Sequence, residues 1–345
     1  MKLNYTKIIL VIVLLCVSFQ QGYSGPRKKL GTTAAPELLI PLGAIGTALQ
    51  GSNLAYTTGV DAIYWNPAGL SVINSNSTEI MFSHMNYFAD LKMEYVAGGV
   101  RVGNLGVVGI SLRNLSFGDP IAVTTEYNPE GTGETFTPTY LIGTLSYAKA
   151  MTDKVRFGTT VKLISEKIDR VSSVGYAFDF GLQYIAGKSG LSFGIALKNL
   201  GPSMRFDGPG LDRSNTSNGN IVYSRTTLQE FDLPTTLEIG LGYHVTLAKK
   251  NNISISSTFQ NSGFTSDEYR FGLEYNYNNY VFLRGAAIVY PDKLKDESLF
   301  GPSFGAGVQY PFKNGITLGF DYAFRLTNES GFDSQNQVFT LHVGF

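Results

Sequence analysis

Ile316-Thr-Leu-Gly-Phe-Asp-Tyr-Ala-Phe-Arg-Leu326 alternates apolar and polar side chains without a break. One face carries the large apolar side chains Ile316, Leu318, Phe320, Tyr322, Phe324 and Leu326, and the other carries Thr317, Gly319, Asp321, Ala323 and Arg325. A period of two is that of a β-strand with two different faces. A slip of one residue would exchange the two faces, so the register is strongly specified.

The same alternation recurs from residue 78 to the C-terminus. It predicts strands near 78–88, 91–102, 105–116, 136–150, 154–168, 171–186, 190–199, 231–247, 250–261, 266–277, 280–289, 301–311, 315–326 and 335–345, which makes fourteen. The faces of 78–88 are not clearly separated.

Long and short connections are distributed in a regular way along the chain, because the long ones all have odd numbers. The long ones, 117–135, 200–230 and 290–300, are the third, seventh and eleventh, so an up-and-down meander places them on one rim. The even-numbered connections are short and carry turn residues such as Gly103-Asn104 and Asn278-Asn279. Outer-membrane barrels have this asymmetry of long loops and tight turns.

The composition agrees with a sheet that faces something other than water. Charged residues make up only 16% of the chain, against about a quarter in typical soluble domains, and there are 20 Tyr and 23 Phe. Lys+Arg and Asp+Glu are both 27, so no net field favours nucleic acid. We predict an all-β protein, a 14-stranded antiparallel transmembrane β-barrel over 77–345 in the lipid of an outer membrane. The alternative is a soluble β-sandwich that packs its aromatic faces together.

Residues 1–24 are predicted to be a secretory signal peptide. Lys2 and Lys7 precede an apolar core at 8–17, and small residues allow cleavage before Gly25. A lipoprotein reading would make Cys16 the first mature residue, but Leu15 stands where a small residue is usual. Without Cys16 the mature protein has no cysteine for disulfides or metal binding.

Residues 25–76 are predicted to form an N-terminal plug. From 31 to 73 this segment is rich in Gly, Ala and Leu, and it contains the only Trp of the chain. The alternative is a helix lying on the periplasmic rim. The candidates for lining a ligand path or the plug are Tyr64, Trp65, Asn66, Pro67, Ala68 and Gly69; for Tyr64 and Trp65 the alternative is packing of plug against wall.

Charged residues on the polar strand faces are predicted to face the lumen. They are Asp179, Lys198, Glu238, Arg270, Glu274, Asp321 and Arg325. Buried charges require partners or water, so two arrangements stay open: a paired network across the lumen, or hydrated charges on a wet wall.

The last strand ends on apolar residues at every second position and a terminal aromatic. These residues, Phe339, Leu341, Val343 and Phe345, match the closing strand that the barrel-assembly machinery reads. The three histidines, His84, His244 and His342, are isolated on different strands, and neither Gly-x-Ser-x-Gly nor His-Glu-x-x-His occurs. We therefore predict no catalytic residue, metal or cofactor.

With strands, plug and closing strand placed, the chain resembles the PorV/PorQ family within the FadL-like outer-membrane barrels, over essentially all of the mature chain. The most specific match is Ile63-Tyr-Trp-Asn-Pro-Ala-Gly-Leu70, similar to the family's WNPAGL element. The Asp-rich step usual before it is reduced to Asp61. The resemblance implies a fourteen-stranded barrel with an N-terminal plug that takes part in type IX secretion, receiving or shuttling exported proteins, with partner contacts on 117–135 and 200–230. The alternative is passive uptake of a hydrophobic ligand, as in FadL-like transporters.

Overall fold

The computed structural model describes residues 31–345 except 74–76, 89, 218–219, 292–299, 314 and 328–335. The predicted signal peptide and both limits of the predicted plug, 25 and 76, lie outside the described residues and stay predictions. Among the helices that are described, none is long and apolar enough to cross a membrane.

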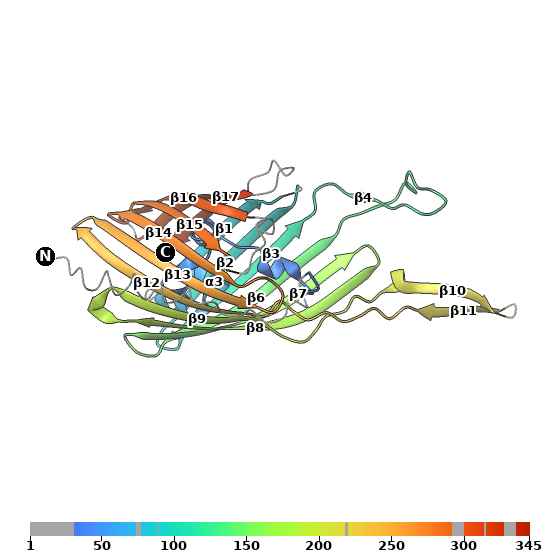
Figure 1. The fold of residues 1–345 in the computed structure, drawn as a ribbon, viewed down its shortest axis with the longest axis horizontal. Helices are drawn as coiled ribbons and strands as arrows, with labels where there is room; N and C mark the ends of the chain where they lie inside the picture. The colour runs from blue at the N-terminus through green and yellow to red at the C-terminus, as the bar shows by residue number, and fades with distance from the viewer. Residues whose placement is uncertain are drawn as a thin grey trace.

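The described strands close into an antiparallel barrel (Figure 1). β1 (Thr78–Asn86) pairs with β18 (Asn336–Gly344) and closes the sheet, with Glu79 opposite Gly344. Between them follow, in order, β2 (Lys92–Val102), β3 (Gly106–Ser116), β6 (Thr139–Ala150), β7 (Val155–Ile168), β8 (Val171–Ile185), β9 (Leu191–Leu200), β12 (Thr236–Ala248), β13 (Asn251–Ser262), β14 (Glu268–Tyr277), β15 (Val281–Val289), β16 (Phe300–Pro311) and β17 (Thr317–Thr327). Fourteen barrel strands in the described part of the chain confirm the predicted fold class.

One predicted strand starts clearly later than its pattern suggests. The pattern begins at 231, but β12 begins at Thr236. Pro234 has no N–H to give to a sheet, and Phe231 forms an isolated bridge with Met204 instead. The alternation of side chains therefore extends beyond the hydrogen-bonded strand.

The barrel turns its apolar faces outward. In β17, Leu318 and Phe320 are exposed while Asp321 and Arg325 are buried. In β1, whose faces the sequence does not separate, Phe82 is exposed and its neighbours in the strand face the lumen. This excludes the sandwich alternative, which would bury the aromatic faces. A closed barrel with an apolar exterior forms all the hydrogen bonds of its backbone between its own strands, as lipid requires. The protein is therefore built to span an outer membrane, as predicted.

The two rims differ as the connection lengths predict. The rim with short turns, here called the turn rim, also holds the start of β1 and the end of β18, and η5 (Gly187–Ser189) lies on it. At one of its turns Asn278 and Asn279 have φ of 53° and 58°, the type I′ geometry of tight hairpins. The opposite loop rim carries two hairpins that extend beyond the barrel, β4 (Ile121–Ala122) with β5 (Thr135–Phe136) and β10 (Asp212–Ser217) with β11 (Asn220–Arg225), the latter preceded by η6 (Pro209–Leu211) (Figure 1).

Residues 36–73, here called the plug, lie inside the barrel. The plug consists of short helices: η1 (Pro36–Leu39), α2 (Ala44–Ala48), η2 (Ser52–Ala55), η3 (Gly59–Asp61), α3 (Ala62–Trp65) and η4 (Pro67–Val72). Its backbone bonds to lumen-facing side chains: Ala44 N–H donates to Thr340 Oγ1 at 2.8 Å, and Ser303 Oγ donates to Ala48 O at 2.8 Å. The predicted plug is thus inside the lumen, which excludes a helix lying on the rim.

Candidate functional site

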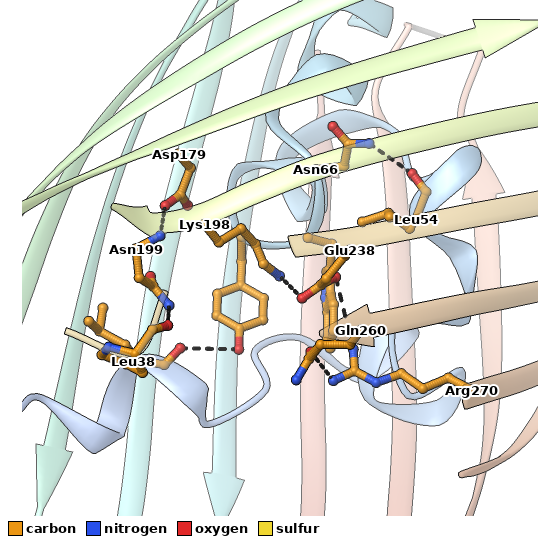
Figure 2. A network of polar contacts seen from close by, with 12 residues as sticks. Leu38, Leu54, Asn66, Asp179, Lys198, Asn199, Glu238, Gln260 and Arg270 are labelled. Atoms are coloured by element: carbon orange, nitrogen blue, oxygen red, sulfur yellow. Dashed lines mark hydrogen bonds and ion pairs between the residues drawn. The ribbon is translucent and has the colours of Figure 1, made fainter. Parts of the chain in front are cut away.

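The plug is fastened at the turn that starts at Asn66. Asn66 is extended, and its side-chain oxygen accepts a hydrogen bond from Ala68 N–H at 3.2 Å, which caps η4. Pro67 suits the first position of that helix because its missing N–H would have no helical partner. The Asn66 amide also donates to Leu54 O at 3.0 Å (Figure 2). It donates as well to Leu182 O of β8 at 3.3 Å. One side chain therefore joins two parts of the plug to the barrel wall.

Two wall glycines allow this turn to approach the wall closely. A Cβ at Gly158 of β7 would lie 2.3 Å from the Pro67 carbonyl carbon and oxygen, and one at Gly181 of β8 would lie 2.1 Å from Asn66 Oδ1. A real Cβ does not fit at these distances. We call Asn66, Pro67, Ala68 and Gly69 the plug anchor; all are buried, and they line neither of the lumen cavities described below.

A loop-side cavity of about 230 Å³ lies between the plug and the loop rim. Tyr64 and Trp65 line it, with their rings edge to face at 4.8 Å between centroids. Trp65 Nε1–H donates to Leu42 O at 2.9 Å and the Tyr64 hydroxyl donates to Leu38 O at 3.4 Å, so the plug itself fixes both rings. Burial raises the pKa of the Tyr64 hydroxyl well above its usual range, which keeps it a neutral donor.

Three of the predicted inward charges stand on the wall of the loop-side cavity at these rings (Figure 2). Lys198 Nζ lies 3.0 Å from Glu238 Oε1 and 4.8 Å from the centre of the Tyr64 ring, a cation–π distance. Arg270 Nη2 lies 2.9 Å from Glu268 Oε2 and also donates to Gln260.

Arg325 lines the same cavity. Its guanidinium carbon lies 3.5 Å from the centre of the Phe300 ring, and the residue is 7% exposed. Stacking of this kind is characteristic of arginine, whose guanidinium is planar and weakly hydrated.

A turn-side cavity of about 430 Å³ lies on the other side of the plug. Here Arg284 joins two predicted charges, with Nε 2.6 Å from Glu274 Oε2 and Nη1 2.5 Å from Asp321 Oδ1. His342 Nε2 lies 3.6 Å from Asp61 Oδ2 of the plug and 3.6 Å from Asp321 Oδ2. Burial raises the pKa of Asp61, and His342 opposes this rise.

Asp179 lies apart from both cavities, near the middle of β8. Its Oδ2 is 2.7 Å from Lys162 Nζ. Its Oδ1 accepts the Asn199 N–H at 2.8 Å (Figure 2). The predicted inward charges are therefore mostly paired across neighbouring strands rather than exposed to a wet lumen.

The sequence prediction misses the partners Lys162, Arg284 and Glu268. A signal exists for Arg284, because the register sets it directly opposite Glu274 on the adjacent strand. Lys162 lies two residues from Thr160, which is opposite Asp179. Both partners can be identified once the register of neighbouring strands is known. The alternation of side chains within one strand does not give that register.

The histidines lie in three separate places. His84 faces outward, with Nδ1 2.6 Å from Glu94 Oε1. His244 Nδ1 lies 2.8 Å from Ser254 Oγ, and its ring meets that of the plug residue Tyr56 at 4.5 Å. Within the described ranges, no group of three or more His, Cys, Asp or Glu side chains has the arrangement of a metal site.

The predicted assembly residues lie at the seam of the barrel. Phe339, Leu341 and Phe345 are exposed on its outer face, and Val343 is half-buried there, opposite Ile80 of β1.

Comparisons with known proteins establish the fold and no family. No protein-family model matches the chain, and no curated protein does. Among solved structures, the toluene transporter TodX of Pseudomonas putida is similar with a TM-score of 0.56 and 14% identity, covering 88% of this chain and 97% of that one. The monoaromatic hydrocarbon channel CymD is similar with a TM-score of 0.55 and 11% identity, covering 89% and 97%. The barrel thus shares the fold of these two channels, while the resemblance to the PorV/PorQ family and to FadL-like barrels stays a prediction.

Proposed function

We propose that this barrel is a passive channel for small hydrophobic molecules across the outer membrane. The observation that carries the proposal is the plug, which separates a loop-side from a turn-side cavity with no lining residue in common. Barrels slightly larger than this one leave an open aqueous channel. A lumen closed by a plug, with an aromatic pocket on the loop side, suits a solute that binds before it moves on.

The size of the pocket and the structural comparisons support the same class of solute. An engineered apolar cavity of about 150 Å³ binds benzene, so a cavity of about 230 Å³ holds a ring with small substituents. The two similar structures are described as a toluene transporter and a monoaromatic hydrocarbon channel. The sequence suggests two functions, and these descriptions favour uptake of a hydrophobic ligand over the type IX role.

Uptake into vesicles tests the proposal. Vesicles whose outer leaflet is lipopolysaccharide slow the passage of apolar solutes, so a channel for such solutes has a measurable effect. With the full chain inserted, we expect faster entry of toluene and unchanged entry of arabinose. Equal toluene entry with and without the protein would reject the proposal, and free entry of arabinose would show an open porin instead.

A second candidate is the type IX secretion role that the resemblance implies. The two hairpins of the loop rim favour it, because they extend beyond the barrel and expose Tyr127 and Tyr223 at 91% and 76% (Figure 1). Exposed aromatic side chains are enriched at protein interfaces. Deletion of the gene would block surface export of type IX cargo if this role holds; normal export in the deletion strain would exclude it.

Lipid and the barrel-assembly machinery are the remaining proposed partners. The apolar outer face supports the first, and the exposed Phe345 at the end of the closing strand supports the second. Removal of Phe345 should lower the amount of inserted barrel in cells; an unchanged amount would argue against recognition of this residue.

A further inference from the structure

We propose that the loop-side cavity binds a small aromatic carboxylate, whose carboxylate group is held by Arg325. This inference rests on the proposed channel function and narrows its substrate class from apolar molecules in general to aromatic acids.

The first observation is a buried guanidinium without a counter-charge. Arg325 is 7% exposed, and its Nε and Nη2 have no hydrogen-bond partner. No carboxylate among the described residues lies within ion-pair distance of it, whereas Arg270 and Arg284 each contact carboxylates at 2.9 Å or less. A guanidinium cannot lose its proton inside a protein, and a buried unpaired charge is costly. Arg325 therefore has the charge and the free donors to bind an anion.

The second observation is the charge balance of the cavity lining. The cationic side chains are Lys198, Arg270 and Arg325, and the carboxylates are Glu238 and Glu268. The described lining thus has one positive charge in excess, so it suits one monovalent anion. A guanidinium donates two parallel hydrogen bonds to a carboxylate, a geometry that a single ammonium does not offer.

A buried hydroxyl group also argues against a plain hydrocarbon as the only occupant. Thr47 Oγ1 lines this cavity, is buried, and has no hydrogen-bond partner in the described structure. A hydrocarbon would leave this hydroxyl and Arg325 unsatisfied, whereas a carboxylate accepts hydrogen bonds from both, and unsatisfied buried groups are where a site discriminates between similar ligands.

The rest of the lining fits an aromatic ring. Leu38, Ile40, Tyr64 and Trp65 present apolar and aromatic surface from the plug. If about 150 Å³ holds the six carbon atoms of benzene, about 230 Å³ holds roughly nine non-hydrogen atoms. Benzoate has this size, and its two ends match the two kinds of surface in the cavity.

The test uses the full chain in detergent with Trp65, the only Trp of the chain, as the fluorescent probe. Benzoate, benzamide and toluene are titrated separately. A charge-assisted pair with Arg325 should make benzoate bind at least about tenfold more tightly than benzamide. Arg325→Met should abolish this preference. Arg205→Met, which removes an arginine paired with Glu230 on the loop rim at 3.4 Å, should keep it.

Two results would overturn the inference. One is equal affinity of the wild-type protein for benzoate and benzamide; the other is an unchanged preference in Arg325→Met. If Arg325→Met does not fold, as judged by thermal denaturation, Arg325→Lys takes its place and should retain only part of the preference. Failure of toluene entry in the vesicle assay rejects the channel itself, whereas toluene entry without a benzoate preference rejects only the carboxylate site.

Discussion

Gly158→Ala should displace the plug while leaving the barrel closed. The added Cβ would lie 2.3 Å from the Pro67 carbonyl group and 2.5 Å from Ala68 N, whereas carbon atoms normally meet at about 3.5–4.0 Å. The two segments must therefore separate by about 1 Å. β7 is hydrogen-bonded along its length to β6 and β8, so the plug moves rather than the wall. Overpacking of this kind costs about 1–3 kcal/mol, and here it lowers the free energy of docking of the plug by that amount.

Two measurements follow the displacement of the plug. Trp65 is nearly fully buried, so its emission should shift to longer wavelength as water enters around it. Conductance across a planar bilayer should rise because the lumen is less well filled. The matched control is Gly143→Ala on β6, where the nearest atom to the new Cβ, Leu112 Cδ1, lies at 4.0 Å. Wild-type emission and conductance in Gly158→Ala would refute a plug anchored at this strand.

Three further changes probe the lumen. Arg284→Met leaves Glu274 and Asp321 without their buried partner, and should lower the free energy of unfolding by about 3–5 kcal/mol, measured by thermal denaturation in detergent; no loss of stability would show these charges to be hydrated. Burial raises the pKa of Asp61, so the docked plug binds a proton more tightly than the undocked plug, and docking should weaken as pH rises from the ordinary Asp range through the raised pKa. Asp61→Asn should flatten the resulting change in tryptophan emission with pH, and an unaltered pH curve would contradict this. Asn66→Leu removes three hydrogen bonds and should weaken docking by about 1–3 kcal/mol, seen as faster proteolysis of the plug; an equal rate would exclude a role for these bonds in docking.

The barrel could be predicted from the sequence because its two determinants are local. Alternation within a strand such as 316–326 sets which side chains face lipid, and turn residues such as Asn278-Asn279 set where the chain reverses. Both signals act over a few residues. The start of β12 shows the limit, since alternation continues through Pro234 although the ladder does not.

The arrangement within the lumen could be predicted only in part. Parity places Glu274 and Asp321 inward, but their shared partner Arg284 depends on which strands are neighbours and on their stagger. The plug was harder still, because its helices are short and its contacts join distant parts of the chain. Nothing near Asn66 in the sequence indicates that the plug approaches the wall at Gly158 and Gly181. A glycine occurs in a strand for several other reasons, such as a bulge or a bend.

The pairing of charges explains why plug and wall can respond separately to mutation. The ion pairs of Lys162 with Asp179, Lys198 with Glu238 and Arg284 with Asp321 all join wall residues to wall residues. The plug approaches this network through the Tyr64 ring, which lies under Lys198, and through Asp61, which faces His342. Movement of the plug therefore need not break these three ion pairs, and breaking a buried ion pair would cost several kcal/mol. Ion pairs that stay within the wall lower the free energy needed to displace the plug, toward a cost that ligand binding could supply.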